Sequence, residues 1–312
     1  MPSLQARMIR TFSRRAIRRD GLDEERLVRH LRRVFNNPPP LSLKPRGARF
    51  TRLDCAGFNG ERCTLAGREP QHTVLYLHGG AYIAGTIRTY RPLAAQLARG
   101  LKADVYLAEY PFAPEQRFPA AVNRCVEAYR FLLGEGKSPT DISIAGDSAG
   151  GGLTLALLLA LHDQGLPMPR CAVLISPGGN CFPSEYVAAN NDSDVMLSAD
   201  MIEKVINVYV GDGDRNHRYA SPAMADLTGL PPLMITVERT EVLYGDALDI
   251  RWRAEEAGVP VSWLEREGLC HVWPVFTPLL PEAREDVAAM IQFINDCASQ
   301  IVAPTSTEAT VA

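Results

Sequence analysis

A serine lies at an abrupt change from strand to helix in residues 141–160, and this stretch constrains the fold more than any other. Ile142 to Ala145 carries the β-branched alternation of a short buried strand, and the Leu/Ala run that follows predicts a buried helix. Between them stands Gly146-Asp-Ser-Ala-Gly150, a G-x-S-x-G motif. This motif holds a serine hydroxyl out on a strained turn, with glycines where neighbouring backbone approaches closely. Ser148 is therefore the predicted nucleophile.

The remaining segments predict an α/β fold with a mainly parallel, eight-stranded sheet. The expected strands are 49–55, 61–66, 73–78, 104–110, 142–145, 171–175, 233–237 and 261–267, and the expected helices of the sheet layers include 90–99, 120–133, 246–258 and 281–298. The first two strands read as a hairpin. From residue 73 onward, apolar strands alternate with helices, which indicates parallel strands covered on both faces. Functional groups should then gather at the carboxyl ends of the strands.

Two stretches interrupt this alternation and predict a cap over the strand ends. We expect residues 1–45 to be an N-terminal helical cap segment, 46–180 the first part of the α/β core, 181–225 a cap insertion, 226–302 the second part of the core, and 303–312 a disordered tail. The insertion contains polar turns at 190–194 and one helix at 199–210, and prolines 38–40 form an extended connector after the N-terminal segment.

Charge and composition exclude several classes of partner. The net charge of −3 gives no overall field for nucleic acid or an anionic membrane. The N-terminal segment is rich in arginine, yet the spacing of Leu22, Leu27, Leu31 and Phe35 favours an amphipathic helix packed on the body over a transit peptide or a membrane-surface helix. No apolar stretch is long enough for a signal sequence or a membrane span, so we expect neither secretion nor membrane insertion.

The seven cysteines are odd in number and scattered, which favours a reducing, cytoplasmic location over a disulfide framework. Cys270, which adjoins a histidine, is predicted to be a small core residue. The sequence has no histidine or cysteine cluster at metal-ligand spacing, so no metal and no cofactor is expected.

A serine nucleophile needs an imidazole to accept its proton and an acid to orient that imidazole. Of the six histidines, only His271 follows the last strand, in a loop that returns to the strand ends, and it is the predicted base. The acid should follow the penultimate strand. Glu241, in the turn after that strand, is the first candidate, and Asp246, at the start of the following helix, is the second.

Attack on a carbonyl also requires donors for the oxyanion. The N–H of Ala149, directly after the nucleophile, should supply one, and the Gly79-Gly80 turn after strand 73–78 should supply the others. His78 is predicted to brace this turn rather than to react. The candidate substrate-pocket residues are Tyr82, Asp147, Phe182 and Trp273.

With these residues identified, the chain resembles the hormone-sensitive-lipase-like family of α/β-hydrolase fold esterases over about residues 70–295. The matching motifs are His78-Gly-Gly-Ala81, Tyr110-x-x-Ala-Pro-Glu115, Gly146-Asp-Ser-Ala-Gly150, Ser221-Pro222, Leu230-Pro-Pro232, Glu241-x-Leu243 and His271. The resemblance implies a Ser148–Glu241–His271 triad, an oxyanion hole from Gly79, Gly80 and Ala149, and a helical cap. Ala81 stands where the family often has glycine, and we expect it to lie outside the main donors.

The predicted activity is hydrolysis of a small carboxylic ester through an acyl-enzyme, with a preference for short acyl chains. A lactone hydrolase, or a deacetylase of a small acylated metabolite, would use the same triad and is not separated from it by sequence. A receptor derived from a hydrolase is a more remote alternative, because both nucleophile and base are retained. Strand 261–267 could form an exposed sheet edge, which makes a homodimer possible.

Overall fold

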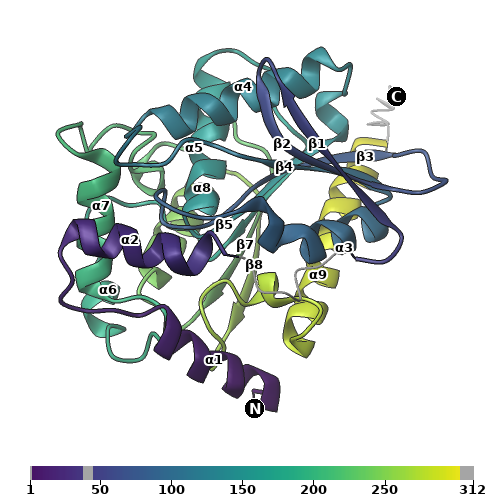
Figure 1. The fold of residues 1–312 in the computed structure, drawn as a ribbon. Coiled ribbons are helices and arrows are strands. Elements are labelled where there is room, and N and C mark those ends of the chain that lie inside the picture. Colours follow the sequence, from purple (N-terminus) through teal and green to yellow (C-terminus); the bar gives the residue numbers. More distant parts are fainter. Residues whose placement is uncertain (1, 38–44, 303–312) are drawn as a thin grey trace, which may run out of the picture.

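The computed structural model describes residues 2–37 and 45–302, and its centre is one eight-stranded sheet (Figure 1). The predicted tail, 303–312, and the connector prolines, 38–40, lie outside the described residues. The strands are β1 (Ala48–Cys55), β2 (Phe58–Leu65), β3 (His72–Leu77), β4 (Ala103–Ala108), β5 (Ile142–Asp147), β6 (Cys171–Ile175), β7 (Leu233–Glu238) and β8 (Val261–Arg266). Their order in the sheet is β1-β2-β4-β3-β5-β6-β7-β8.

The sheet is antiparallel only at its beginning. β1 pairs with β2, and β2 with β4, in antiparallel register, whereas β4, β3, β5, β6, β7 and β8 are parallel to one another. Every residue of β3 to β7 is buried, as expected for strands that are covered on both sides. The predicted fold class, an α/β-hydrolase fold with a mainly parallel sheet, is confirmed.

Helices cover both faces of this sheet. The helices are α1 (Leu4–Ala16), α2 (Glu24–Phe35), α3 (Arg91–Leu101), α4 (Ala120–Gly134), α5 (Ala149–Asp163), α6 (Glu185–Ala189), α7 (Ala199–Val210), α8 (Tyr244–Glu256) and α9 (Pro281–Val302). A separate hydrophobic core lies on each face, and alternate residues of β3 point into the two cores. Val74 and Tyr76 face the core that contains α3 and α9, while Leu75 and Leu77 face the core that contains α4, α5 and α8. None of the helices that the structure describes combines the length and apolar character needed to cross a bilayer.

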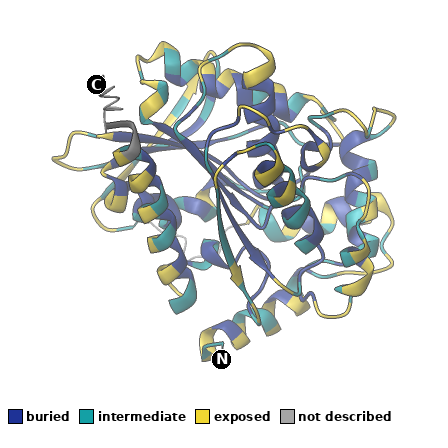
Figure 2. Cartoon of the chain, turned by 180° about the vertical axis from the view of Figure 1, so that it is seen from behind, coloured by how far each residue is buried: buried dark blue, intermediate teal, exposed yellow. Residues whose placement is uncertain are grey.

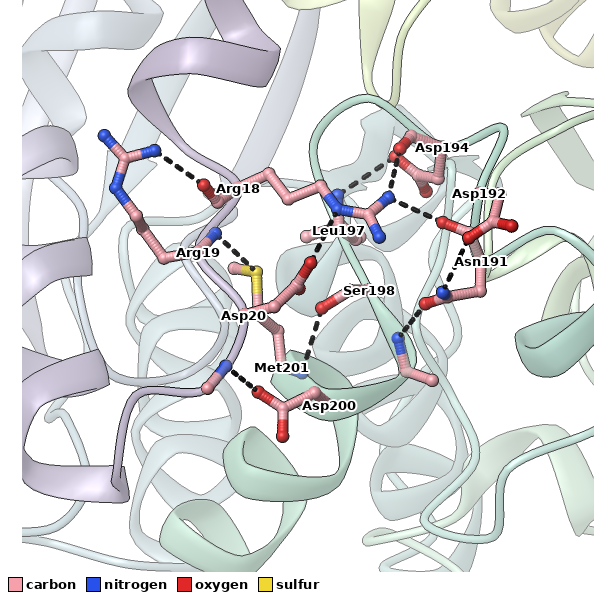
Figure 3. A network of polar contacts seen from close by, with 12 residues as sticks. Arg18, Arg19, Asp20, Asn191, Asp192, Asp194, Leu197, Ser198, Asp200 and Met201 are labelled. Atoms are coloured by element: carbon pink, nitrogen blue, oxygen red, sulfur yellow. Dashed lines mark hydrogen bonds and ion pairs between the residues drawn. The ribbon is translucent and has the colours of Figure 1, made fainter.

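The N-terminal segment is bound to the insertion by a network of polar contacts (Figure 3). The Arg18 guanidinium donates to the carbonyls of Asn191 and Asp194, each at 2.6 Å, and the N–H of Gly21 donates to Asp200 at 2.9 Å. Most of these acceptors lie just before or at the start of α7. Two parts of the chain that are distant in sequence therefore form one layer at this end of the molecule.

The two N-terminal helices bury different kinds of side chain. Leu27 and Leu31 of α2 are buried in the main core, as their spacing predicts. In α1 the buried residues are the small Ala6 and Ser13, whereas Leu4, Met8 and Phe12 are exposed. The expected packing of an amphipathic helix on the body, which rests on the spacing of Leu22, Leu27, Leu31 and Phe35, is therefore seen in α2. The large exposed side chains of α1 lie outside that expectation.

Candidate active site

Ser148 lies in a tight turn between β5 and α5, and the glycines on either side of it allow close backbone contacts. β5 ends at Asp147 and α5 begins at Ala149, so Ser148 alone makes the change of direction, with φ 54° and ψ −123°. A Cβ atom on Gly146 would lie 2.2 Å from the carbonyl oxygen of Gly150, and one on Gly150 would lie 2.0 Å from that of Leu77. Both glycines are therefore required by close backbone approach, and the strained serine is held by packed surroundings.

Ser148, His271 and Glu241 meet at the carboxyl ends of the strands. The Nε2 atom of His271 lies 2.8 Å from the Ser148 Oγ, and its Nδ1 atom lies 2.9 Å from Glu241 Oε2. The three residues come from the segments after β5, β8 and β7, and His271 and Glu241 are almost fully buried. An imidazole held in this way can accept the serine proton while the carboxylate stabilises the resulting positive charge.

The charges around His271 favour its protonated form. Burial by itself lowers the pKa of the imidazole, but the Glu241 carboxylate, with smaller effects from Asp194 and Asp147, raises it above the ordinary histidine value. Burial raises the pKa of Glu241 to about 7, and the contact with His271 opposes that rise. The imidazole is thus the favoured site for a proton arriving from the serine.

Asp194 and Asn190, which the sequence analysis treated only as part of polar turns, hold the loop that carries Glu241. Asp194 is buried, and it accepts hydrogen bonds from the N–H groups of Val242 at 2.9 Å and Met196 at 2.7 Å. The Asn190 amide donates to the carbonyl of Glu241 at 2.9 Å. The polar run 190–194 marks a turn in the sequence, but no local pattern indicates which distant loop it contacts.

The turn after β3 departs from the prediction at its first glycine. The N–H of Gly79 donates to the Asp147 carboxylate at 2.9 Å and to the Tyr90 hydroxyl at 3.0 Å, so it is not free for a substrate oxygen. Gly80 and Ala81 line the cavity beside Ser148, and their N–H groups have no acceptor within the described chain. Ala149 is the first residue of α5, where an N–H has no partner in the helix. Ala81, with φ 58°, therefore replaces Gly79 among the free donors of this turn.

Asp147 is among the residues that line the cavity, and its carboxylate also braces this turn from beneath. It is 1% exposed and accepts hydrogen bonds from the hydroxyls of Tyr76 and Tyr90 as well as from Gly79. Burial raises the pKa of Asp147 to about 6, against these hydrogen bonds, which lower it. On the other side, His78 Nδ1 lies 2.6 Å from the carbonyl of Gly79, which is the bracing position expected for His78.

A largely apolar cavity of about 130 Å³ opens beside Ser148. Its walls come from the Gly80–Tyr82 turn and α5 on one side and from α2 and α7 on the other. The ring of Tyr82 stacks on Tyr209 of α7 at 3.8 Å between centroids, and the Tyr82 hydroxyl donates to Gly178 at 3.1 Å. Tyr82 therefore lies where the sequence analysis put it, in the pocket lining.

The pocket candidates Phe182 and Trp273 lie outside the cavity lining, whereas the second candidate acid, Asp246, lines the cavity without contacting the base. Phe182 is 43% exposed and outside the cavity lining, because its side chain faces solvent. Trp273 is fully buried in the core, where its indole N–H donates to Asp286 of α9 at 2.7 Å. Asp246, the second candidate acid, accepts from the N–H groups of Gly179 and Asn180 and does not contact His271. The pocket assignments of Phe182 and Trp273 are therefore wrong.

Known proteins match this chain over most of its length. The α/β hydrolase fold family matches residues 74–275. An acetyl-hydrolase of Streptomyces hygroscopicus is 40% identical over 230 residues, which are 73% of this chain and 77% of that protein. An esterase of Acinetobacter venetianus is 33% identical over 266 residues, 84% of each chain. The structure of an esterase from the bacterial hormone-sensitive lipase family has a TM-score of 0.86 at 31% identity, covering 96% of this chain and 99% of that one.

The chain belongs to the α/β-hydrolase fold family. Its sequence relatives and structural neighbours are esterases and acetyl-hydrolases, and within the family the chain is an esterase of the hormone-sensitive-lipase-like group. The family and enzyme class inferred from the sequence motifs are thereby confirmed.

Proposed function

We propose that the esterase works through an acyl-enzyme formed on Ser148. His271 takes the hydroxyl proton as Ser148 attacks the ester carbonyl, gives that proton to the leaving alcohol, and then activates the water that releases the acid. Glu241 orients the ring and stabilises the imidazolium. The continuous contact from Ser148 Oγ through His271 to Glu241, at 2.8 and 2.9 Å, is the observation that supports these roles.

The oxyanion of the tetrahedral intermediate is proposed to bind the N–H groups of Gly80, Ala81 and Ala149. These donors surround the cavity next to Ser148, and donors of this kind contribute about 2.7 to 4 kcal/mol each to lowering the barrier. Gly79 contributes indirectly, because its hydrogen bonds to Asp147 and Tyr90 keep the turn in place.

The proposed substrates are esters of short, apolar acids. The cavity of about 130 Å³ is close to the size of a cavity that holds a benzene-sized molecule, so it suits an acetyl to butyryl group better than a long chain. The stacked pair Tyr82 and Tyr209 limits its extension toward α7.

Turnover of p-nitrophenyl esters from acetate to decanoate tests both parts of this proposal. Ser148→Ala should reduce kcat by about four orders of magnitude or more while the circular dichroism spectrum stays unchanged. Ser138→Ala, at an exposed loop position, is the matched control and should keep full activity. Full activity in Ser148→Ala would show that Ser148 is not the nucleophile. A decanoate preference in the wild-type enzyme would contradict only the chain-length assignment.

Removal of acetyl groups from a small metabolite is the second candidate function. It rests on the 40% identical relative, which is named an acetyl-hydrolase. A panel of O-acetylated and N-acetylated compounds, lactones and simple aryl acetates would rank these substrates by kcat/KM. A kcat/KM for an O-acetylated metabolite well above that for aryl acetates would favour this function.

A homodimer and a reducing, cytoplasmic environment complete the proposal. β8 forms one edge of the sheet, so its outer backbone groups are available to pair with a second copy. All seven cysteines are free thiols, which suits a reducing compartment. Sedimentation of the purified protein, and fractionation of cells that express it, would test these two points separately.

A further inference from the structure

The outer face of α1 is an apolar stripe that the described chain leaves uncovered. Leu4, Met8 and Phe12 recur every four residues, so they lie above one another on one side of the helix and span about 12 Å. Their exposed fractions are 70, 65 and 69%. Figure 2 shows this helix, next to the N-terminus, at the margin of the molecule with much of its surface exposed. An aligned stripe differs from scattered surface side chains and indicates a binding face.

Contacts at both ends hold α1 in a fixed position. Ser3, which caps the helix, donates to Glu282 through its N–H at 2.7 Å and through its hydroxyl at 2.9 Å. Arg10 donates to the carbonyl of Leu269, and Arg18, just after the helix, donates to the carbonyls of Asn191 and Asp194. The stripe is therefore presented by an ordered helix rather than by a loose terminus.

Positive charge accompanies the stripe. Arg7, Arg14 and Arg15 are exposed on α1, and within the described residues none of them forms an ion pair. Residues 4–16 contain no aspartate or glutamate. A helix with exposed large apolar side chains, flanking arginines and no acidic residue has the properties of helices that lie in the plane of a membrane interface.

We propose that α1 docks this esterase on an anionic lipid bilayer, lying in the plane of the interface without crossing it. Leu4, Met8 and Phe12 enter the boundary between headgroups and acyl chains, and Arg7, Arg14 and Arg15 bind lipid phosphates. This differs from the sequence-based expectation, in which the spacing of Leu22, Leu27, Leu31 and Phe35 favours a helix packed on the body over a membrane-surface helix.

Charge favours a lipid surface over a second copy of the chain. A symmetric pair of α1 helices would bring two sets of three arginines together with no acidic residue of the helix to offset them. Anionic headgroups neutralise the same arginines, and the acyl boundary accepts the apolar side chains. The docked helix also lies close to the proposed base, since Arg10 binds Leu269, two residues before His271.

Co-sedimentation of the full-length protein with large unilamellar vesicles tests the proposal. The vesicles are phosphatidylcholine alone, or three parts phosphatidylcholine to one part phosphatidylglycerol. We expect binding to the anionic vesicles that exceeds binding to the neutral ones. Arg7→Gln/Arg14→Gln/Arg15→Gln should weaken it by about fivefold per arginine, on the order of a hundredfold together. Leu4→Gln/Met8→Gln/Phe12→Gln should weaken it by roughly tenfold or more.

Control variants carry substitutions of the same kind at exposed positions outside α1. Arg49→Gln/Arg68→Gln/Arg284→Gln controls for net charge, and Trp252→Gln/Leu279→Gln controls for exposed apolar surface. Both should bind like the wild type, and all variants should hydrolyse p-nitrophenyl acetate in solution at the wild-type rate.

Three results would overturn the proposal: no wild-type binding to anionic vesicles, equal binding by the α1 and control variants, or conversion of a dimer to a monomer by the stripe variant in sedimentation velocity. The last result would assign the stripe to a second copy of the chain. None of these results depends on esterase activity, so the proposed function is tested separately.

Discussion

Replacing Asp194 by asparagine tests whether the cap insertion positions the acid of the site. The carboxylate accepts from Val242 through Oδ2 and from Met196 and Leu197 through Oδ1. An asparagine oxygen can keep the Oδ1 contacts, but its NH₂ group would then face the Val242 N–H, and that hydrogen bond is lost. A hydrogen bond to a charged group contributes about 1.5 to 3 kcal/mol, so the variant should lose about 2 kcal/mol of stability. The melting temperature should fall by a few degrees.

The same substitution should change the pH dependence of catalysis. Asp194 raises the pKa of His271, and the base must be neutral to accept a proton. Removing the negative charge lowers the pKa of His271, so the acid limb of the kcat/KM profile should move to lower pH in Asp194→Asn. Because Val242 adjoins Glu241, losing its hydrogen bond should also displace the acid. The plateau value of kcat/KM should then fall by about tenfold if the displacement costs about 1.4 kcal/mol of transition-state stabilisation.

Asp200→Asn is the matched control for this variant. Asp200 is another carboxylate of the cap that accepts a backbone N–H, from Gly21 at 2.9 Å, but it does not contact the Glu241 loop. Profiles of p-nitrophenyl butyrate hydrolysis from pH 5 to 9 would be measured for both variants at a temperature where both are folded. If the acid limb of Asp194→Asn coincides with those of Asp200→Asn and the wild type, the assigned effect on His271 is wrong.

Three further predictions address the nucleophile turn, the cavity and the base. Gly150→Ala should lower kcat by about a hundredfold, because the new Cβ would lie 2.0 Å from the Leu77 carbonyl oxygen; steady-state kinetics on a variant with a native circular dichroism spectrum would check this. Tyr209→Ala should extend the cavity and raise the ratio of octanoate to butyrate kcat/KM, measured with p-nitrophenyl esters. In the wild type, kcat/KM should fall as the pH is lowered through an apparent pKa above the ordinary 6.5 of histidine, since Glu241 favours the inactive imidazolium. A stopped-flow pH series would measure this apparent pKa, and a value below 6.5 would contradict the prediction.

The sequence predicted those parts of the site that depend on backbone order and local sterics. Gly146 and Gly150 indicate the tight turn at Ser148. The order of strands in a doubly wound sheet brings the loops that carry residues 241 and 271 to the carboxyl ends of the strands. These rules account for the contacts among Ser148, His271 and Glu241.

The errors concern side-chain direction and competition among hydrogen bonds. Gly79 was expected to face the substrate, but a buried aspartate one residue before the nucleophile takes its N–H. Trp273 follows His271 by two residues, yet the left-handed conformation of Val272, φ 53°, turns the chain so that the indole enters the core. Local sequence periodicity predicts neither outcome, because each depends on a partner that is distant in sequence.

The cap and the proposed chemistry are joined by an unbroken series of contacts. Arg18, just after α1, holds the carbonyl of Asp194, and the Asp194 side chain holds Val242. Glu241, the neighbour of Val242, holds His271, which contacts Ser148. Through Asp194, the N-terminal segment is therefore connected to the loop that carries Glu241. A face of α1 that binds a lipid surface would lie at the outer end of this same series of contacts.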